Sequence, residues 1–226
     1  MIMDNSYNYV ARNIYKIKEQ INNEAILIIA VSKTVTCETA ALALEVPGVE
    51  LGENRVQEFL KKYEYFQGKA KIHLIGHLQK NKVKYIIGKT PLIHSVDSQE
   101  LLEEIQKRSS LQQVITDVLI QVKIYDEETK YGADEKDVIN LIHYNESNPN
   151  VKIKGLMTMA PFTENEQIIS QTFRKLNDIF VDIRKNTFYN TDMVYLSMGM
   201  SNDFMLAAKE GANVLRIGSA IFKDIP

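Results

Sequence analysis

The 226-residue sequence has a single cysteine, no long apolar run and almost no excess of either charge. Because Cys37 alone cannot form an intrachain disulfide or complete a zinc cluster, disulfide-rich secreted folds are excluded and a cytoplasmic, reducing location is expected. The longest wholly apolar stretch, 25–31, is far shorter than the roughly 20 residues that a membrane-spanning helix requires. The first residues also lack the basic start and apolar core of a secretory signal.

Proline and glycine are also scarce, with five and ten residues, which excludes a collagenous, low-complexity or linker-dominated chain. The 27 basic and 29 acidic residues give a net charge of −2, and the sequence pI is about 6.1. This balance argues against a surface built mainly to bind nucleic acid or acidic membranes. With 45% hydrophobic residues, the composition is that of an ordinary globular protein.

Short β-branched segments alternate with amphipathic helical segments along the whole sequence. The expected strands centre on 26–31, 49–51, 72–75, 92–94, 114–122, 153–157, 193–196 and 214–217. Eight such units without a Gly/Pro-rich break predict an α/β fold, a single (β/α)₈ TIM barrel over 1–226, although a doubly wound open sheet also alternates. An additional N-terminal helix within 1–24, with Val10, Ile14, Ile17 and Ile21 at helical spacing, should pack outside the barrel core.

Two helix starts carry the spacing of a capping box. Thr163 stands three residues before Glu166, and Asp97 stands three residues before Glu100. In such a box the two side chains satisfy backbone N–H groups of the first helical turn. We therefore expect Thr163 and Asp97 to cap the helices that follow them.

Polar residues follow most of the expected strands, where a barrel has its functional face. They are Lys33, Glu53, Asn54, His77, Ser95, Asp97, 197–201 and 216–219. Lys33 ends the most hydrophobic strand, and a partly desolvated lysine there would have a lowered pKa and could form an imine with an aldehyde or ketone. A solvated lysine that only begins a loop is the alternative.

The segments 196–201 and 216–219 each place glycine and hydroxyl groups in a strand-to-helix turn. In barrels the loops after strands 7 and 8 commonly bind phosphate, because backbone N–H groups and a helix dipole face the anion. Ser201 taken alone could be only an N-cap, and Gly218 taken alone only a turn residue. Because the two occur together, after the two strands where a barrel commonly binds phosphate, a phosphate site is favoured. Met198 and Met200 flank the first turn.

Three other motifs are weak. The tripeptide 88–90 imitates the end of a P-loop but lacks its upstream glycine. His73 and His77 have the spacing of helical zinc ligands but straddle a strand end, so no metal site is expected. The acidic stretch 126–128 lacks the alternating ligands of a calcium loop and is interpreted as a solvated loop.

An imine-forming lysine, a phosphate-binding turn and a nearby arginine together indicate pyridoxal phosphate. Its aldehyde would meet Lys33, its phosphate would lie by Ser201, Gly218 and Ser219, and its ring nitrogen would lie near Arg216. A cationic arginine keeps the ring nitrogen unprotonated and so disfavours chemistry that needs a fully developed carbanion.

Seven ordered blocks resemble the pyridoxal-phosphate homeostasis protein family, single-domain relatives of the alanine-racemase barrel. The blocks lie at 30–34, 52–58, 73–82, 94–97, 155–157, 196–201 and 214–222. The resemblance implies a protein that holds the cofactor as a Schiff base on Lys33 and acts in intracellular vitamin B6 balance, without established turnover. The cofactor-binding residues it implies, with Met200 added at the phosphate turn, are Lys33, Asn54, Ser197, Met200, Ser201, Arg216, Gly218 and Ser219.

Other functions stay open at this stage. A weak amino-acid racemase is one, although the second domain that supplies the opposing base in alanine racemases is not expected in this chain. A cofactor-free Schiff-base aldolase acting on a sugar phosphate is another, and a non-enzymatic interaction protein is the most distant. We expect a monomer whose partners are pyridoxal phosphate and, as candidates, apoenzymes that accept it.

Overall fold

The computed structural model describes residues 8–125 and 131–224, which form a closed barrel of eight parallel strands in sequential order. The strands are β1 Leu27–Val31, β2 Val49–Glu53, β3 Ile72–Leu74, β4 Ile93–Val96, β5 Thr116–Gln121, β6 Val151–Met157, β7 Thr191–Ser197 and β8 Val214–Ile217. β8 pairs with β1 and closes the ring, so the open sheet is excluded and the predicted (β/α)₈ barrel is confirmed.

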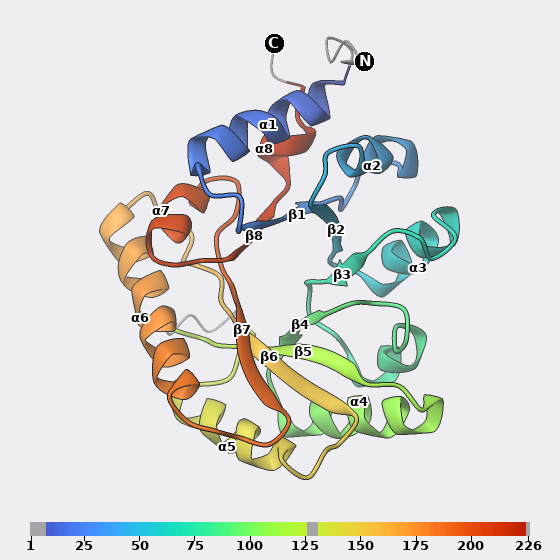
Figure 1. Ribbon diagram of the computed structural model, residues 1–226, viewed down its shortest axis with the longest axis vertical. Helices are drawn as coiled ribbons and strands as arrows, with labels where there is room; N and C mark the ends of the chain where they lie inside the picture. Colours follow the sequence, from blue (N-terminus) through green and yellow to red (C-terminus); the bar gives the residue numbers. More distant parts are fainter. Residues whose placement is uncertain (1–7, 126–130, 225–226) are drawn as a thin grey trace.

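Helices surround the ring of strands (Figure 1). They are α1 Tyr9–Ile21, α2 Cys37–Leu44, α3 Val56–Tyr65, α4 Gln99–Gln112, α5 Glu135–Asn145, α6 Glu166–Arg184, α7 Phe204–Lys209 and α8 Ser219–Phe222, with a 3₁₀ helix, η1 Lys80–Tyr85, between β3 and β4. No helix of the described ranges is long and apolar enough to cross a membrane. The acidic stretch 126–128 lies outside the described residues.

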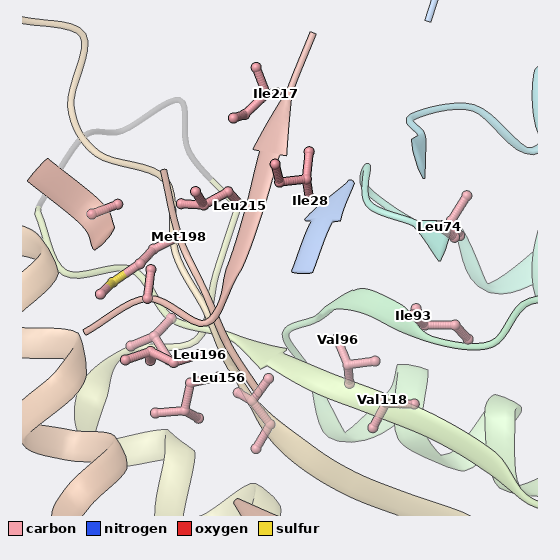
Figure 2. Close-up of a cluster of buried hydrophobic side chains, with 14 of the residues drawn as sticks. Ile28, Leu74, Ile93, Val96, Val118, Leu156, Leu196, Met198, Leu215 and Ile217 are labelled. Carbon is pink, nitrogen blue, oxygen red and sulfur yellow. The ribbon is translucent and has the colours of Figure 1, made fainter. Parts of the chain in front are cut away.

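The strands bury two separate apolar faces. The larger cluster joins strands to helices, and Figure 2 shows Ile28, Leu215 and Ile217 among its members. A smaller cluster is made by Leu92, Leu119 and Met157, against which Tyr195 packs. Because successive strand residues point to opposite faces, residues between members of the larger cluster face the barrel interior.

Helix α1 packs against α2 and α8 outside the barrel, as its apolar spacing predicts (Figure 1). Val10, Ile14 and Ile17 are buried there. The buried Asn13 fixes the contact, because its Nδ2 donates to the carbonyls of Ile221 and Lys223, each at 3.0 Å. The N-terminal helix therefore ties down the C-terminal end of the helix that follows β8.

Both capping-box predictions are wrong. Helix α6 is capped by Asn165, whose Oδ1 accepts from the backbone N–H groups of Gln167 and Ile168, while Thr163, two residues earlier, accepts only from the Asn165 N–H. Helix α4 begins after Ser98, which makes no side-chain cap bond. A capping residue must directly precede the first helical residue to reach its N–H groups, and neither Thr163 nor Asp97 does so.

Candidate functional site

Lys33 lies in a tight turn after β1. The turn is closed by the Val35 N–H, which donates to the Ser32 carbonyl at 3.2 Å, and Lys33 and Thr34 are its central residues. Lys33 is exposed and has no hydrogen-bond or ion-pair partner among the described residues, so the partial desolvation expected for it is not found. Thr34 adopts a φ of 69°, which is costly for a β-branched residue and typical of backbone held for a functional reason.

A buried ion pair lies directly behind this turn. Lys62 Nζ is 2.8 Å from Glu53 Oε1 and donates to the Ser32 carbonyl at 3.1 Å, while the Ser32 hydroxyl donates to the same carboxylate oxygen at 2.6 Å. All three side chains are buried. The network joins the ends of β1 and β2 to α3, and it fixes the residue before Lys33 on both its backbone and its side chain.

Asn54 follows β2, the strand beside β1. Its Oδ1 is buried and has no hydrogen-bond partner within 8–125 and 131–224, and the same holds for Glu53 Oε2. A Cβ at Gly76 would come within 2.3 Å of the Asn54 carbonyl oxygen, so only glycine allows the chain after β3 to pack against it. A buried amide oxygen without a partner is costly, which indicates a position meant for a hydrogen-bond donor of a ligand.

The turns after β7 and β8 are joined by Ser201. Its hydroxyl oxygen accepts from the backbone N–H groups of Gly218 and Ala220, both at 3.2 Å. A Cβ built on Gly218 would meet the Val31 carbonyl oxygen at 3.3 Å, so this turn also packs closely on the end of β1. The two glycine-containing turns and the strand that leads to Lys33 are therefore neighbours.

A cavity of about 900 Å³ opens beside these turns. Of the predicted site residues, Met200, Ser201 and Ser219 line it, together with Asp203 and residues of the loop after β6 such as Phe162. Lys33, Asn54, Ser197, Arg216 and Gly218 are not among its lining residues. The cavity has the size of a small-molecule site and lies at the carboxyl end of the barrel, where barrel ligands bind.

Arg216 lies between Leu215 and Ile217 of β8 and faces the barrel interior. Its NH1 donates to the Ser197 hydroxyl oxygen at 2.6 Å and its NH2 to the Thr158 carbonyl at 2.8 Å. Burial lowers the pKa of Arg216 to about 10, while Asp203 acts in the opposite direction. The guanidinium therefore stays cationic at neutral pH, and three of its five N–H groups are not used by these two bonds.

The contacts of Arg216 continue across the barrel through two histidines. Ser197 Oγ is 3.0 Å from His94 Nδ1, His94 Nε2 is 3.0 Å from His73 Nδ1, and His73 Nε2 is 2.5 Å from Glu50 Oε2. Burial, with smaller contributions from His73 and Arg216, holds the pKa of His94 well below its ordinary value. Glu50, bonded to His73 and to Lys71, has a lowered pKa even though burial opposes the shift.

Of this row of side chains, Ser197 and Arg216 were predicted to bind the cofactor, whereas Glu50, His73 and His94 had no predicted role. A signal was present, because Glu50 and His73 each stand between two apolar residues at an expected strand, and His94 follows Leu92 and Ile93 at the end of another. That alternation marks polar groups on the inner face of the sheet.

His73 and His77 contact different partners. His77 stacks on Tyr131 with ring centroids 3.8 Å apart, and its Nδ1 is 3.9 Å from Asp97 Oδ2. Burial raises the pKa of Asp97, and His77 opposes that shift. In 8–125 and 131–224 no group of three or more His, Cys, Asp and Glu side chains is arranged to hold a metal ion.

The predicted residues thus gather at four adjacent strands. Ser197, Met200 and Ser201 belong to β7 and the turn that follows it, Arg216, Gly218 and Ser219 to β8 and the start of α8, Lys33 to the turn after β1, and Asn54 to the end of β2. Strand pairing places Arg216 opposite Ile29 of β1. The arrangement can hold a small anionic molecule at the β7–β8 end and present a free amine from the neighbouring strand.

The fold and these turns define a barrel of the alanine-racemase type. The family described as "Alanine racemase, N-terminal domain" matches residues 6–226. The pyridoxal phosphate homeostasis protein of Aquifex aeolicus is 44% identical over 198 residues, covering 87% of this chain and 86% of that protein, and its human counterpart is 33% identical over 210 residues, covering 87% and 76%. The chain belongs to the family of pyridoxal phosphate homeostasis proteins.

Solved structures agree with this assignment. PipY of Synechococcus elongatus, solved without and with PLP bound, superposes with TM-scores of 0.88 and 0.86 at 28% identity, covering 95% of this chain and 100% of PipY in both cases. Alanine racemase of Corynebacterium glutamicum superposes with a TM-score of 0.73 at 12% identity, covering 96% of this chain and 61% of the racemase. At that identity the likeness concerns the fold alone.

Proposed function

We propose that this protein binds pyridoxal 5′-phosphate covalently on Lys33 and serves to hold and release it in vitamin B6 homeostasis. The observation that carries the proposal is the juxtaposition of a cationic, buried Arg216 and the Ser201–Gly218 turns with the β1 end that bears Lys33. The names of the relatives and the PLP-bound PipY structure support it. Secondary effects on amino-acid balance would follow from the supply of this cofactor.

The residues present fit this cofactor. Ser201, Gly218 and Ser219 would hold the phosphate beside the cavity, with Met200 at its edge, because hydroxyl and backbone N–H groups converge there. Asn54 Oδ1, which no described residue contacts by a hydrogen bond, offers an acceptor to a polar group of the ligand. Lys33, with a free side chain among the described residues, would supply the amine.

Pyridoxal phosphate supplies an electrophilic aldehyde and an electron-withdrawing ring. Arg216 is a donor only, so it can bind an unprotonated ring nitrogen but cannot take a proton from it. Ser197 and Thr158 hold two nitrogens of the guanidinium and so set its plane. An electron sink weakened in this way suits storage of the cofactor better than carbanion chemistry, so we propose binding without sustained turnover.

The wider setting of this role is also a proposal. We take 1–226 to act as a single domain, with helix α1 packed on the barrel, and as a monomer in the cytoplasm. Apoenzymes that require pyridoxal phosphate are the candidate recipients. The relatives that are named homeostasis proteins, rather than enzymes, support the absence of turnover.

The test is to load the purified protein with pyridoxal phosphate, treat it with borohydride and locate the reduced adduct by peptide mass spectrometry. We expect an absorption band that borohydride bleaches and an adduct on Lys33, both lost in Lys33→Ala. Lys80→Ala is the matched control, because Lys80 is also an exposed lysine but follows β3, two strands away from β1. No adduct on Lys33 in the loaded protein would reject the proposal, and trapping that requires a sugar phosphate would point to an aldolase.

A further inference from the structure

Five side chains form a continuous hydrogen-bonded row through the barrel. It runs from Arg216 on β8 through Ser197 on β7, His94 on β4 and His73 on β3 to Glu50 on β2, with successive distances of 2.6, 3.0, 3.0 and 2.5 Å. The four members from Arg216 to His73 are buried, and Glu50 keeps 18% of its side chain exposed. We call these residues the interior chain.

The protons of the interior chain can be placed by counting donors and acceptors. The ionised Glu50 can only accept, so His73 must carry its proton on Nε2. A neutral His73 then accepts at Nδ1, which puts the proton of His94 on Nε2 and leaves His94 Nδ1 to accept from the Ser197 hydroxyl. Ser197 Oγ in turn accepts from Arg216, which can only donate. Both ends of the chain impose the same direction.

The opposite arrangement fails at Ser197. If His73 were a cation, it would donate to His94, and the proton of His94 would move to Nδ1 and point at Ser197 Oγ. Arg216 already donates to that oxygen, so the serine's own proton would lose the acceptor it has in the chain. A buried donor left unpaired costs much of what the bonds contribute.

We propose that His94, supported by His73 and Glu50, is a positioning residue that fixes Arg216 in the cofactor site. In the interior chain the Ser197 hydroxyl donates to His94. Toward Arg216, Ser197 Oγ therefore acts only as an acceptor, and it holds NH1. The Thr158 carbonyl holds NH2. With both terminal nitrogens held, the remaining N–H groups have one defined direction. Their use on the ring nitrogen rests on the proposed function, whereas the chain itself does not.

The interior around the chain makes a purely space-filling role costly. Leu92, Leu119 and Met157 fill the neighbouring part of the barrel with apolar groups. Five buried polar side chains are tolerated in place of apolar ones only when every polar group has a hydrogen-bond partner. Such a network then specifies one arrangement of its side chains. What that arrangement specifies here is the orientation of the guanidinium.

The first test needs no cofactor. The protein has four histidines, so labelling with ¹⁵N-histidine gives signals from four imidazole rings. His77 and His143, which lie outside the interior chain, are the internal references. At pH 7 we expect His73 and His94 both to be neutral with the proton on Nε2. A proton on Nδ1 of His94, or a doubly protonated His73, would contradict the proton arrangement described for the interior chain.

The second test measures the affinity for pyridoxal phosphate. We expect His94→Phe and Glu50→Ala each to weaken binding about tenfold, the size of one lost hydrogen bond to a charged group, and Glu50→Gln to recover much of the loss because its oxygen still accepts. The controls are His143→Phe and Glu146→Ala, which break an exposed histidine–carboxylate pair of 3.1 Å on the outside of the barrel. They should bind like the wild type.

The outcomes separate the two proposals. If the wild type binds no pyridoxal phosphate, the proposed function fails. The histidine tautomers measured in the first test still show whether the interior chain has the described proton arrangement. If the wild type binds and folded His94→Phe and Glu50→Ala bind equally well, the positioning role is rejected. Should His94→Phe fail to fold, Glu50→Ala decides, because Glu50 lies at the partly exposed end of the chain, remote from Arg216.

Discussion

Lys62 and Glu53 form a buried ion pair next to Ser32, the residue that precedes Lys33. Removing one partner leaves the other charge buried without compensation, so Lys62→Met should lower the free energy of unfolding by about 3–5 kcal/mol. Replacing both residues by methionine removes both charges and should recover at least about half of that loss. Urea unfolding followed by circular dichroism measures both.

Lys175→Met is the control for this ion pair. Lys175 and Glu135 are 2.7 Å apart but both about half exposed, so breaking their contact should change stability by less than about 1 kcal/mol. If Lys62→Met were as stable as Lys175→Met, the charge on Glu53 would have to be solvated or neutralised in the folded protein, and the packing described behind the Lys33 turn would be wrong.

Single residues at strand ends were predictable, whereas contacts between distant residues were not. Lys33, Ser201 and Arg216 stand directly at or after apolar segments, and a barrel gathers such positions on one face. The exposure of Lys33 depends on the turn at Thr34, and no local sequence pattern encodes that turn. Ser197 and His94 are 103 residues apart, and only the closure of the barrel brings them together.

At the scale of elements, α1 and α8 are coupled through Asn13. The carbonyls of Ile221 and Lys223 each lose a donor in Asn13→Ala, which should lower the free energy of unfolding by about 1–3 kcal/mol. Asn13→Asp should lower it further, because it places a carboxylate against the same two oxygens. Urea unfolding should therefore rank the chains as wild type, then alanine, then aspartate.

Asn186→Ala provides the comparison for this contact, because Asn186 donates to the Asp182 carbonyl on an exposed surface. We expect it to change stability by less than about 0.5 kcal/mol. Asn13→Ala should leave borohydride trapping on Lys33 intact, since Asn13 contacts the end of α8 that is remote from Ser219. Equal stability of the aspartate and alanine variants would show that the two bonds do not form in solution.

The elements themselves were largely predictable, and their ends were not. Apolar period and β-branched content are properties of whole segments, and they place all eight strands. A helix start depends on one or two side chains, and Thr163 competes there with Asn165, two residues nearer to the helix. Asn165 caps the helix because it is nearer to the first turn and accepts from two backbone N–H groups at once.

At the scale of the whole molecule, barrel closure buries a titratable ring in the interior, and this links stability to pH. Burial holds the pKa of His94 well below 6.5, so below that pH the unfolded chain binds a proton that the folded chain does not. The contribution of His94 is therefore fully present above about pH 6.5 and is lost as the pH falls. The slope is at most about 1.4 kcal/mol per pH unit for one proton.

Other groups act on stability with the opposite sign. Burial raises the pKa values of Asp97, Asp117 and Asp203, so the folded chain binds their protons first and gains stability as the pH falls. Glu50 and Glu210, with lowered pKa values, lose their contribution only below about pH 4.5. The difference between wild type and a His94 variant therefore isolates the histidine better than the absolute stability does.

His94→Gln keeps an acceptor for Ser197 and a donor for His73 but does not titrate. We expect the stability of the wild type relative to this variant to be constant above about pH 7 and to fall steadily between about pH 6.5 and 5, as measured by urea unfolding at successive pH values. His143→Gln is the comparison variant, because it makes the same substitution at an exposed position on α5. A pH-independent difference for His94→Gln would mean that His94 takes up its proton in the folded barrel. The interior chain could then not keep the direction that holds Arg216.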